Sequence, residues 1–451
     1  MKTLSLSILS SVILSSSLFG VTLKQTNTDN SLIIYNSNIG LVHEKRELKL
    51  DAGDKQIIYT DVAQTINTDS VNVELPSEVS LFSQQYRFDK LTQQKLLDAH
   101  IGKIVSVRVE DNEKNFRSVQ ATLLSSDNLK SIVKTDDELI ITVENKNIIF
   151  SAIPNELITK PSLVWNIETQ DDVDSQISID YLIHKINWKS NYILNLKEDK
   201  ADLTGWVTID NRSGKSFKET SLHVLAGDIN RAKKPQVNYR IAKSMMTMDS
   251  PEMKHKAVEG YHFYSVPFKV NLANNEKTQI KFITQKNIEI QRKYNSTMNN
   301  PNHLKGEISH DVTQHLTLDG FKDPLPQGVV RSYSKLKDTN ILLGETRIQH
   351  TPTNTPLSLK LGKNFDVKVK ETFLNFDNGA WNLDVDIKYT IKNSSKDTKT
   401  IEILIPFNRN KGSTVTSEEE YEYTKGNLVT FNIEVKAQSS KEFKVHFKTK
   451  K

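Results

Sequence analysis

The stretch Asp384-Val385-Asp386-Ile387-Lys388-Tyr389-Thr390-Ile391 alternates polar and apolar side chains without a break. Successive side chains of a β-strand point to opposite faces, so this alternation predicts a strand with one buried face. The same pattern recurs at 203–210, 398–405 and 441–448. Polar turn signals separate such runs at 51–54, 211–214, 377–379 and 425–427. Short alternating strands joined by polar turns predict an all-β chain of tandem antiparallel β-sandwiches.

One short helix is expected between these strands. Thr92 is a favourable N-cap, Leu96 and Leu97 supply an apolar face, and Gly102 ends the helix after Ile101. The sequence that follows holds five short strand patterns, at 103–109, 117–124, 129–134, 139–143 and 148–153. Five strands in about fifty residues predict a small closed barrel of the SH3 or Sm type, because closure removes exposed sheet edges.

These patterns predict a division of the chain into domains. We expect a signal peptide at 1–20, an N-terminal β domain ending in the short helix at 21–100, a small β-barrel at 101–155, a central β-sandwich at 156–345, and a C-terminal β-sandwich at 346–451. The segments 231–259 and 297–311 lack periodicity and are expected to be mobile loops of the central sandwich. Neither heptads nor an internal repeat stands out.

The N-terminus predicts export. Met1-Lys2 is followed by an uncharged apolar run from Leu4 to Phe19, and Gly20 is a small residue suited to signal-peptidase cleavage. We expect a periplasmic or cell-surface protein with no membrane span after cleavage, because no second uncharged run of about 18 residues occurs.

Composition narrows the chemistry. The chain has no cysteine, which excludes disulfides, thiolate zinc sites and cysteine nucleophiles. Sixty Lys and Arg residues nearly balance 55 Asp and Glu residues, and no basic stripe with aromatic residues occurs, so nucleic acid is not expected as a partner.

Several phrases resemble a bacterial family called "domain of unknown function 4139", found in exported proteins and in proteins called mucoidy inhibitor A. The clearest is Leu325-Pro326-Gln327-Gly328-Val329-Val330-Arg331-Ser332-Tyr333. Further matching phrases and residues are 33–75, Trp188, Tyr192, Gly205, Asn211, Gly214, 225–228, 343–345, 348–352 and 361–367. The chain departs from the mucoidy-inhibitor pattern by having the small barrel in place of a long coiled coil. The resemblance implies an exported, β-rich envelope protein and implies no reaction.

Two groups of residues could bind a metal. His303, Glu307, His310, Asp311 and His315 lie within thirteen residues and include zinc ligand types. His310 and His315 are five residues apart, which suits neither one face of a helix nor one face of a strand. Surface histidines on a solvated loop are therefore the favoured alternative.

The second group is a methionine cluster. Four of the six methionines, Met245, Met246, Met248 and Met253, lie close together and are followed by His255. Thioether and imidazole ligands suit monovalent copper. The favoured alternative is a flexible loop whose methionines pack loosely, so no metal and no cofactor is expected.

Other candidate motifs have structural interpretations. No nucleophile elbow and no phosphate-binding glycine loop occurs. The phrase 350–352 is expected to be a turn, and Glu418-Glu419-Glu420 a charged loop before a strand. The four tryptophans lie inside strand patterns, and core burial is favoured over stacking on a sugar: Trp165, Trp188, Trp206 and Trp381.

The sequence thus predicts an exported bacterial envelope protein that acts as a non-catalytic scaffold or binding module for envelope proteins or polysaccharide. The alternative is a periplasmic hydrolase of envelope polysaccharide or peptide, with carboxylates or histidines contributed by distant loops.

Overall fold

The computed structural model of the protein is nearly all β-sheet, with 66% of residues in strands and 4% helical. It describes residues 20–24, 29–110, 116–226, 256–258, 261–303, 305–408, 412–424 and 427–450. The all-β class expected from the alternating pattern is confirmed. None of the helices in these ranges is long and apolar enough to cross a membrane.

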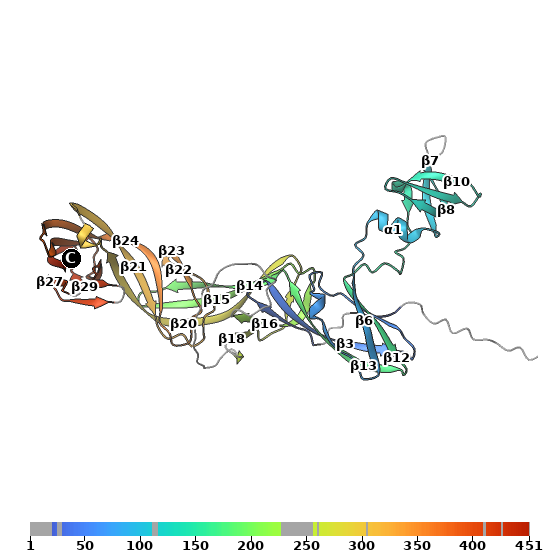
Figure 1. Ribbon diagram of the computed structural model, residues 1–451, viewed down its shortest axis with the longest axis horizontal. Helices are drawn as coiled ribbons and strands as arrows, with labels where there is room; N and C mark the ends of the chain where they lie inside the picture. Colours follow the sequence, from blue (N-terminus) through green and yellow to red (C-terminus); the bar gives the residue numbers. More distant parts are fainter. Residues whose placement is uncertain are drawn as a thin grey trace, which may run out of the picture. The chain divides into compact units, whose positions relative to one another are not determined.

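The chain forms two compact units, each of which is discontinuous in sequence (Figure 1). Unit 1 comprises Met1–Asn187, Asp210–Val224 and Val266–Glu276, and unit 2 comprises Trp188–Ile209, Leu225–Ser265 and Lys277–Lys451. The signal peptide expected at 1–20 lies outside the described residues except for Gly20.

Unit 1 contains two larger sheets. The first has the order β1-β4-β12-β6, formed by β1 (Val21–Leu23), β4 (Gln56–Thr60), β12 (Ser162–Thr169) and β6 (Val79–Arg87). The second contains the order β16-β2-β3-β13-β5, with β19 beside β16, formed by β16 (Phe217–Ala226), β2 (Ser31–Tyr35), β3 (Ile39–Leu50), β13 (Val173–His184), β5 (Asn72–Glu74) and β19 (Val270–Leu272). Alternate residues of β13 are buried, as its period-two pattern requires: Ile177, Ile179, Tyr181 and Ile183.

The structure does not divide the chain at 156, where a boundary between the barrel and the central sandwich was expected. β12 pairs with β4 and β6, and β13 pairs with β3 along its whole length. These strands therefore lie in unit 1 with the N-terminal strands, and not in a separate central sandwich. Pairing between strands more than a hundred residues apart leaves no mark in local periodicity.

The segment expected to form a small closed barrel holds the expected short helix and a five-stranded antiparallel sheet (cyan in Figure 1). α1 (Gln93–His100) begins at Thr92, whose side-chain oxygen accepts from Lys95 N at 3.2 Å, and the chain leaves it through Gly102 at a φ of 79°. The strand order is β10-β9-β8-β7-β11, formed by β10 (Ile140–Glu144), β9 (Lys130–Thr135), β8 (Phe116–Ser126), β7 (Ile104–Glu110) and β11 (Ile148–Ile149). Its core comprises Leu97, Val105, Val107, Ala121, Leu123, Val133 and Ile148.

Unit 2 is built on a large sheet of mainly antiparallel strands. Along its main path the order is β23-β22-β14-β15-β20-β21-β24-β25-β30-β27, formed by β23 (Thr339–Ile348), β22 (Gly328–Leu336), β14 (Ile186–Leu196), β15 (Lys200–Asn211), β20 (Glu276–Thr297), β21 (Glu307–Leu318), β24 (Leu357–Asn378), β25 (Asn382–Asn393), β30 (Ser439–Lys450) and β27 (Thr414–Ser417). The remaining strands are β26 (Lys399–Pro406), β28 (Tyr421–Thr424), β29 (Leu428–Val435), β17 (Lys256–Val258) and β18 (Tyr261–Ser265).

Long strands run through two cores of unit 2. The first half of β24 places Leu359 and Leu361 in one core, and its second half places Val367 and Val369 in the other. The expected boundary at 345 therefore does not separate these cores. The expected loop at 297–311 is also wrong in part, because β21 starts at Glu307 after the 3-10 turn Pro301–His303. The loop expected at 231–259 lies outside the described residues apart from β17.

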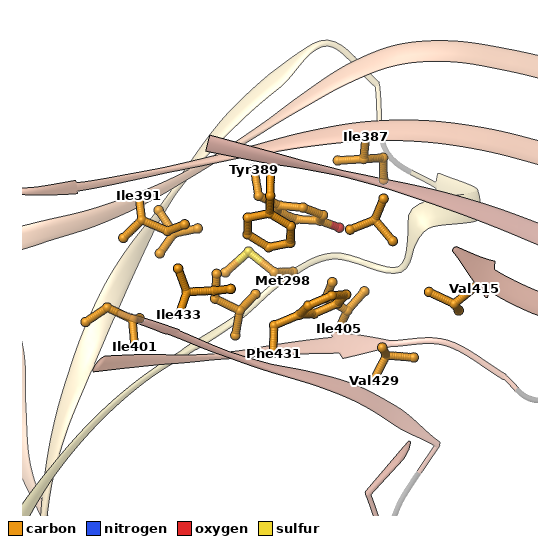
Figure 2. Close-up of a cluster of buried hydrophobic side chains, with 14 of the residues drawn as sticks. Met298, Ile387, Tyr389, Ile391, Ile401, Ile405, Val415, Val429, Phe431 and Ile433 are labelled. Carbon is orange, nitrogen blue, oxygen red and sulfur yellow. The ribbon is translucent and has the colours of Figure 1, made fainter. Parts of the chain in front are cut away.

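The C-terminal core contains the stretch that opened the sequence argument. Val385, Ile387, Tyr389 and Ile391 are all fully buried, as are the alternate residues of the facing strands. Figure 2 shows Tyr389 and Ile391 on one side and side chains such as Phe431 on the other, with Met298 between them. At about 25 cal/mol per Å² of apolar surface, this burial is the main contribution to the stability of the sandwich.

The corner that follows β15 is held by one asparagine. Asn211 is buried, and its Nδ2 donates to three backbone carbonyls, those of Lys215 (2.8 Å), Leu272 (3.4 Å) and Ala273 (3.1 Å). Its Oδ1 accepts from the backbone N and the Oγ of Ser213. The Asn211 side chain thus supplies hydrogen-bond partners for three backbone carbonyls and one backbone N–H group at this corner.

The corner that follows β25 is built in the same way. Asn393 is buried, and its Nδ2 donates to the carbonyls of Asp397 (2.8 Å), Val435 (3.1 Å) and Lys436 (3.1 Å). Its Oδ1 accepts from the backbone N and the Oγ of Ser395. We call these two features the Asn211 corner and the Asn393 corner.

The similarity of the corners extends to their neighbours, which reveals a structural repeat that the sequence analysis did not detect. The residue after each asparagine donates its backbone N to a carbonyl: Arg212 to that of Lys185, between β13 and β14, at 2.9 Å, and Ser394 to that of Asp366 in β24 at 2.7 Å. Lys185 and Asp366 therefore hold equivalent places beside the two corners, although Lys185 is a turn residue with a φ of 58° and Asp366 lies inside a continuous strand. The repeat is limited to the corners, which share only the triplet Asn-x-Ser, so it was not apparent in the sequence.

Candidate functional site

A cluster of buried charged side chains lies in unit 1. Glu44 and Arg46 are each 1% exposed and follow one another on the inner face of β3. Arg46 donates to Glu44 Oε2 at 2.9 Å, Tyr59 donates its hydroxyl to the same oxygen at 2.9 Å, and Lys215 donates to Glu44 Oε1. We call these four residues the Glu44 cluster. They come from β3, β4 and the Asn211 corner.

Further contacts close the Glu44 cluster. Arg46 also donates to the carbonyls of Leu23 (2.9 Å) and Thr60 (2.7 Å), and its guanidinium lies 3.5 Å from the centre of the Tyr59 ring. Lys215, with 4% of its side chain exposed, donates to the carbonyl of Asp61 at 2.6 Å. A solute has no route to groups this deeply enclosed, so the cluster stabilises unit 1 and offers no site for a substrate.

The electrostatics of the cluster follow from this geometry. Burial by itself would raise the pKa of Glu44, but the charges of Lys215 and Arg46 outweigh it and hold that pKa at about 2. Burial lowers the pKa of Lys215, and burial together with the Glu44 charge raises the pKa of Tyr59, which remains a neutral donor. Glu44 is therefore a carboxylate throughout the physiological range.

Sequence reasoning missed the Glu44 cluster, although a signal was present. Glu44 and Arg46 are in phase with Val42, Leu48 and Leu50 on the buried face of β3. Charged residues on the apolar face of an alternating strand predict a buried ion pair.

A second buried carboxylate lies in unit 2. Glu371 is fully buried in the second half of β24, on the inner face that also carries Val369. Its carboxylate accepts from Asn299 N (3.1 Å), Asn299 Nδ2 (3.1 Å) and His310 Nε2 (2.9 Å). The fully buried phenol of Tyr389 is affected by the same charge, since burial and then Glu371 raise the pKa of Tyr389. We call Glu371, His310 and Asn299 the Glu371 cluster.

The Glu371 cluster has the residue types of a general acid–base pair, because a carboxylate orients an imidazole. His310 is 15% exposed, so solvent contact is slight. No serine, threonine or water-activating group is hydrogen-bonded to this imidazole in the described part of the chain. The geometry suits a second role better, in which Glu371 holds the backbone that leads from β20 into the turn Pro301–His303.

Replacing His310 by Ala is expected to lower the free energy of unfolding of unit 2 by about 1–3 kcal/mol, because it removes the imidazole that is hydrogen-bonded to a buried carboxyl group. Hydrogen exchange at the Asn299 amide should become faster. The matched control is His446→Ala, which removes a half-exposed imidazole paired with Asp384 and Asp386 and should change stability by less than about 1 kcal/mol. Equal effects of the two substitutions would contradict this assignment.

The histidine-rich segment does not converge on one point. His310 contacts Glu371, whereas Asp311 pairs with Lys363 and Lys368, and Glu307 pairs with Lys370 at 3.1 Å. Among the described residues, no group of three His, Cys, Asp or Glu side chains could hold a metal ion. Met245, Met246, Met248, Met253 and His255 lie outside the described residues.

The tryptophans divide between core and surface. Trp165 and Trp188 are 0% and 5% exposed, and Trp206 is half-buried. The expectation of burial is wrong for Trp381, which is 79% exposed. It lies in the turn between β24 and β25, where no facing strand covers it.

The phrase 350–352 does not form the expected turn. Thr351 makes an isolated antiparallel bridge with Leu325 through two backbone hydrogen bonds, at 2.8 and 2.9 Å, and the turn follows at 353–354. Glu418-Glu419-Glu420 lies between β27 and β28.

One polar hollow of about 290 Å³ opens beside the Asn393 corner. It is lined by Lys392, Asn393, Ser394, Gln438, Ser439 and Ser440. It contains no carboxylate and no imidazole, so it lacks the paired groups of a hydrolytic site.

Comparisons with known proteins bring no relative. No family model matches the chain, and no curated protein matches it. The resemblance to the exported family therefore stays a prediction.

Proposed function

We propose that this protein is an exported bacterial envelope protein that acts as a non-catalytic scaffold or binding module. The observation that carries this proposal is the state of the two buried carboxylates. Glu44 and Glu371 are each saturated by hydrogen bonds from neighbouring side chains or backbone, in clusters that hold strands together. A catalytic carboxylate needs access to a substrate, and these two groups have none.

The surface supports a binding role. The five-stranded sheet of unit 1 and its turns expose large aliphatic side chains, and clusters of exposed apolar side chains commonly mark interaction sites. The most exposed of them are Ile104 (65%), Leu129 (77%), Leu139 (61%) and Ile140 (66%).

The rival function is a periplasmic hydrolase, and within the described residues the Glu371 cluster has the residue types that such an activity would use. Incubation of the purified protein with cell-wall polysaccharide and peptide is expected to release no product. Product release that His310→Ala or Glu371→Gln abolishes, while the His446→Ala control retains it, would overturn the non-catalytic proposal.

Export is tested separately. Deletion of residues 2–20 is expected to leave the protein in the cytoplasmic fraction, because the charged start and the apolar run are what the secretion machinery recognises. The full-length chain should appear in the periplasmic or surface fraction, shortened at or near Gly20. A full-length chain that stays cytoplasmic would contradict the proposed location.

A further inference from the structure

Strand β10 is one edge of the five-stranded sheet of unit 1. Among the described strands it pairs with β9 alone, and the residues on both of its faces are at least partly exposed. Proteins commonly protect such an edge with bulges, prolines or charges that point inward. β10 has none of these, because its register is regular and its inward residues are Ile141 and Val143. The β10 edge is therefore open to pairing with another strand.

The hydrogen bonds of β10 show which of its backbone groups are free. Thr135 N donates to the carbonyl of Leu139 at 2.9 Å, so the odd-numbered residues of this segment face β9. The even-numbered residues turn their backbone groups away from β9. The N–H groups of Thr142 and Glu144 and the carbonyls of Ile140 and Thr142 consequently have no backbone partner among the described residues.

We infer that two copies of this chain dimerise through β10, paired antiparallel about a two-fold axis at Thr142. The two Thr142 residues then exchange two backbone hydrogen bonds. Glu144 N of each copy donates to the carbonyl of Ile140 of the second copy, so every free group named above finds a partner. The dimer goes beyond the proposed function and does not depend on it.

The position of Thr142 selects this register. Thr142 is the middle residue of β10 (Ile140–Glu144), so a two-fold axis there pairs the strand along its whole length. An axis at Glu144 would place two carboxylates opposite each other, which is unfavourable across a strand pair. An axis at Ile140 would pair β10 only at its first residue.

The side chains of β10 also suit pairing with a second copy. Ile141 and Val143 face the core of the sheet, but each is only half-buried. In the dimer, Ile141 lies opposite Val143 of the second copy, and these pairs remove apolar surface from water. On the outer face the two Thr142 side chains lie opposite each other, which is a favourable cross-strand pair.

Opposite charges meet at both ends of this pairing. Glu138 and Lys146 lie four residues on either side of Thr142, and their side chains are 78% and 76% exposed. The two-fold axis brings Lys146 of each copy toward Glu138 of the second copy. Glu138 already pairs with Lys134, and Lys146 pairs with Glu144 at 2.6 Å, so the dimer joins two ion pairs at each end. Such complementary charge favours this partner and this register.

Disulfide trapping tests the two-fold register, since the chain contains no cysteine of its own. Thr142→Cys places two thiols opposite each other, where the Cα atoms of a hydrogen-bonded pair are about 5.5 Å apart, within the range of a disulfide. The matched control is Gln120→Cys, which is also exposed on this sheet but lies in β8, away from the edge. We expect the Thr142→Cys protein to form a disulfide-linked dimer about tenfold faster than the control.

Thr142→Pro tests the backbone hydrogen bonds. This N–H points away from β9, so an edge strand can accept proline here without losing its own pairing. The change removes two hydrogen bonds from the dimer and should raise its dissociation constant about tenfold or more. Sedimentation equilibrium over a range of protein concentrations measures the constant, and circular dichroism checks the fold. The matched control, Thr142→Val, keeps the N–H and should dimerise as tightly as the natural protein.

Each outcome decides the question. A natural protein that stays monomeric, equal disulfide rates at positions 142 and 120, or a dimer that a folded Thr142→Pro protein retains at full strength would overturn the inference. Assemblies larger than a dimer would show that β10 pairs with a different edge, such as β11, and would overturn the two-fold arrangement. If Thr142→Pro did not fold, the disulfide rates would still decide. These measurements are independent of the export and hydrolysis tests of the proposed function.

Discussion

Replacing Glu44 by Gln is expected to lower the free energy of unfolding of unit 1 by about 3–5 kcal/mol, because it leaves the charges of Arg46 and Lys215 buried without their counter-ion. Glutamine keeps the size of the side chain, so the loss reports charge and hydrogen bonding and not a cavity. Urea unfolding and calorimetry measure the change, and unit 2 should retain its own transition.

The control for this prediction uses an exposed ion pair on the same two strands. Asp174 of β13 pairs with Lys49 of β3 at 3.1 Å, with 76% and 72% of the side chains exposed. Asp174→Asn should change the stability by less than about 1 kcal/mol, because solvent screens an exposed pair. A Glu44→Gln protein as stable as this control would refute the structural role of the Glu44 cluster.

The effect of Glu44→Gln should also depend on pH. The pKa of Glu44 is about 2 in the folded protein and 4.5 ordinarily, so the folded state favours the carboxylate. The stabilisation from this group is fully present above pH 4.5 and is lost as the pH falls toward 2. The stability difference between the natural protein and Glu44→Gln should therefore shrink over this interval. A difference that stays constant from pH 6 to pH 2.5 would contradict the lowered pKa.

The second large effect is expected at the Asn393 corner. Asn393→Asp should lower the free energy of unfolding of unit 2 by about 3–5 kcal/mol, because a carboxylate cannot donate to the three carbonyls that Nδ2 now satisfies, and it adds a buried charge. Chemical denaturation followed by tryptophan fluorescence measures the loss. The matched control is Asn382→Asp, at the other end of β25, where the side chain is half-buried and the loss should be below about 1 kcal/mol.

Because the Asn211 corner is built like the Asn393 corner, the same substitution should have a similar effect there. Asn211→Asp should reduce the stability of unit 1 by a similar amount, since Asn211 makes the same set of hydrogen bonds. If Asn393→Asp were harmless while Asn211→Asp were severe, the two corners would not be energetically equivalent.

Local patterns predicted the strands and the helix well. Val385, Ile387, Tyr389 and Ile391 were placed on a buried face by alternation alone, and each is fully buried. The N-cap Thr92 was also recognisable, because a cap is made by residues three apart in sequence. Trp381 shows the limit: its strand-like surroundings predicted burial, but no other layer covers the turn in which it lies.

The two buried clusters are formed by contacts between residues that are far apart in the sequence. Glu44 meets Lys215 across 171 positions of sequence, and Glu371 meets His310 across 61. The phase of Glu44 within β3 could have marked it as buried, whereas its partner could not have been named. Spacing in sequence therefore directed attention to the histidine segment at 303–315, whose members have separate partners in the structure.

The amino-acid sequence by itself determined that this chain is all-β, where its helix begins, and which apolar side chains of the alternating strands face inward. These properties depend on neighbouring residues, which set strand periodicity and capping. Only the tertiary structure decided that β12 and β13 join the N-terminal strands and that the two asparagine corners share one pattern of hydrogen bonds. The physical reason is that sheet pairing uses backbone groups common to all residues, so the choice of partner strand is made by the packing of the whole unit.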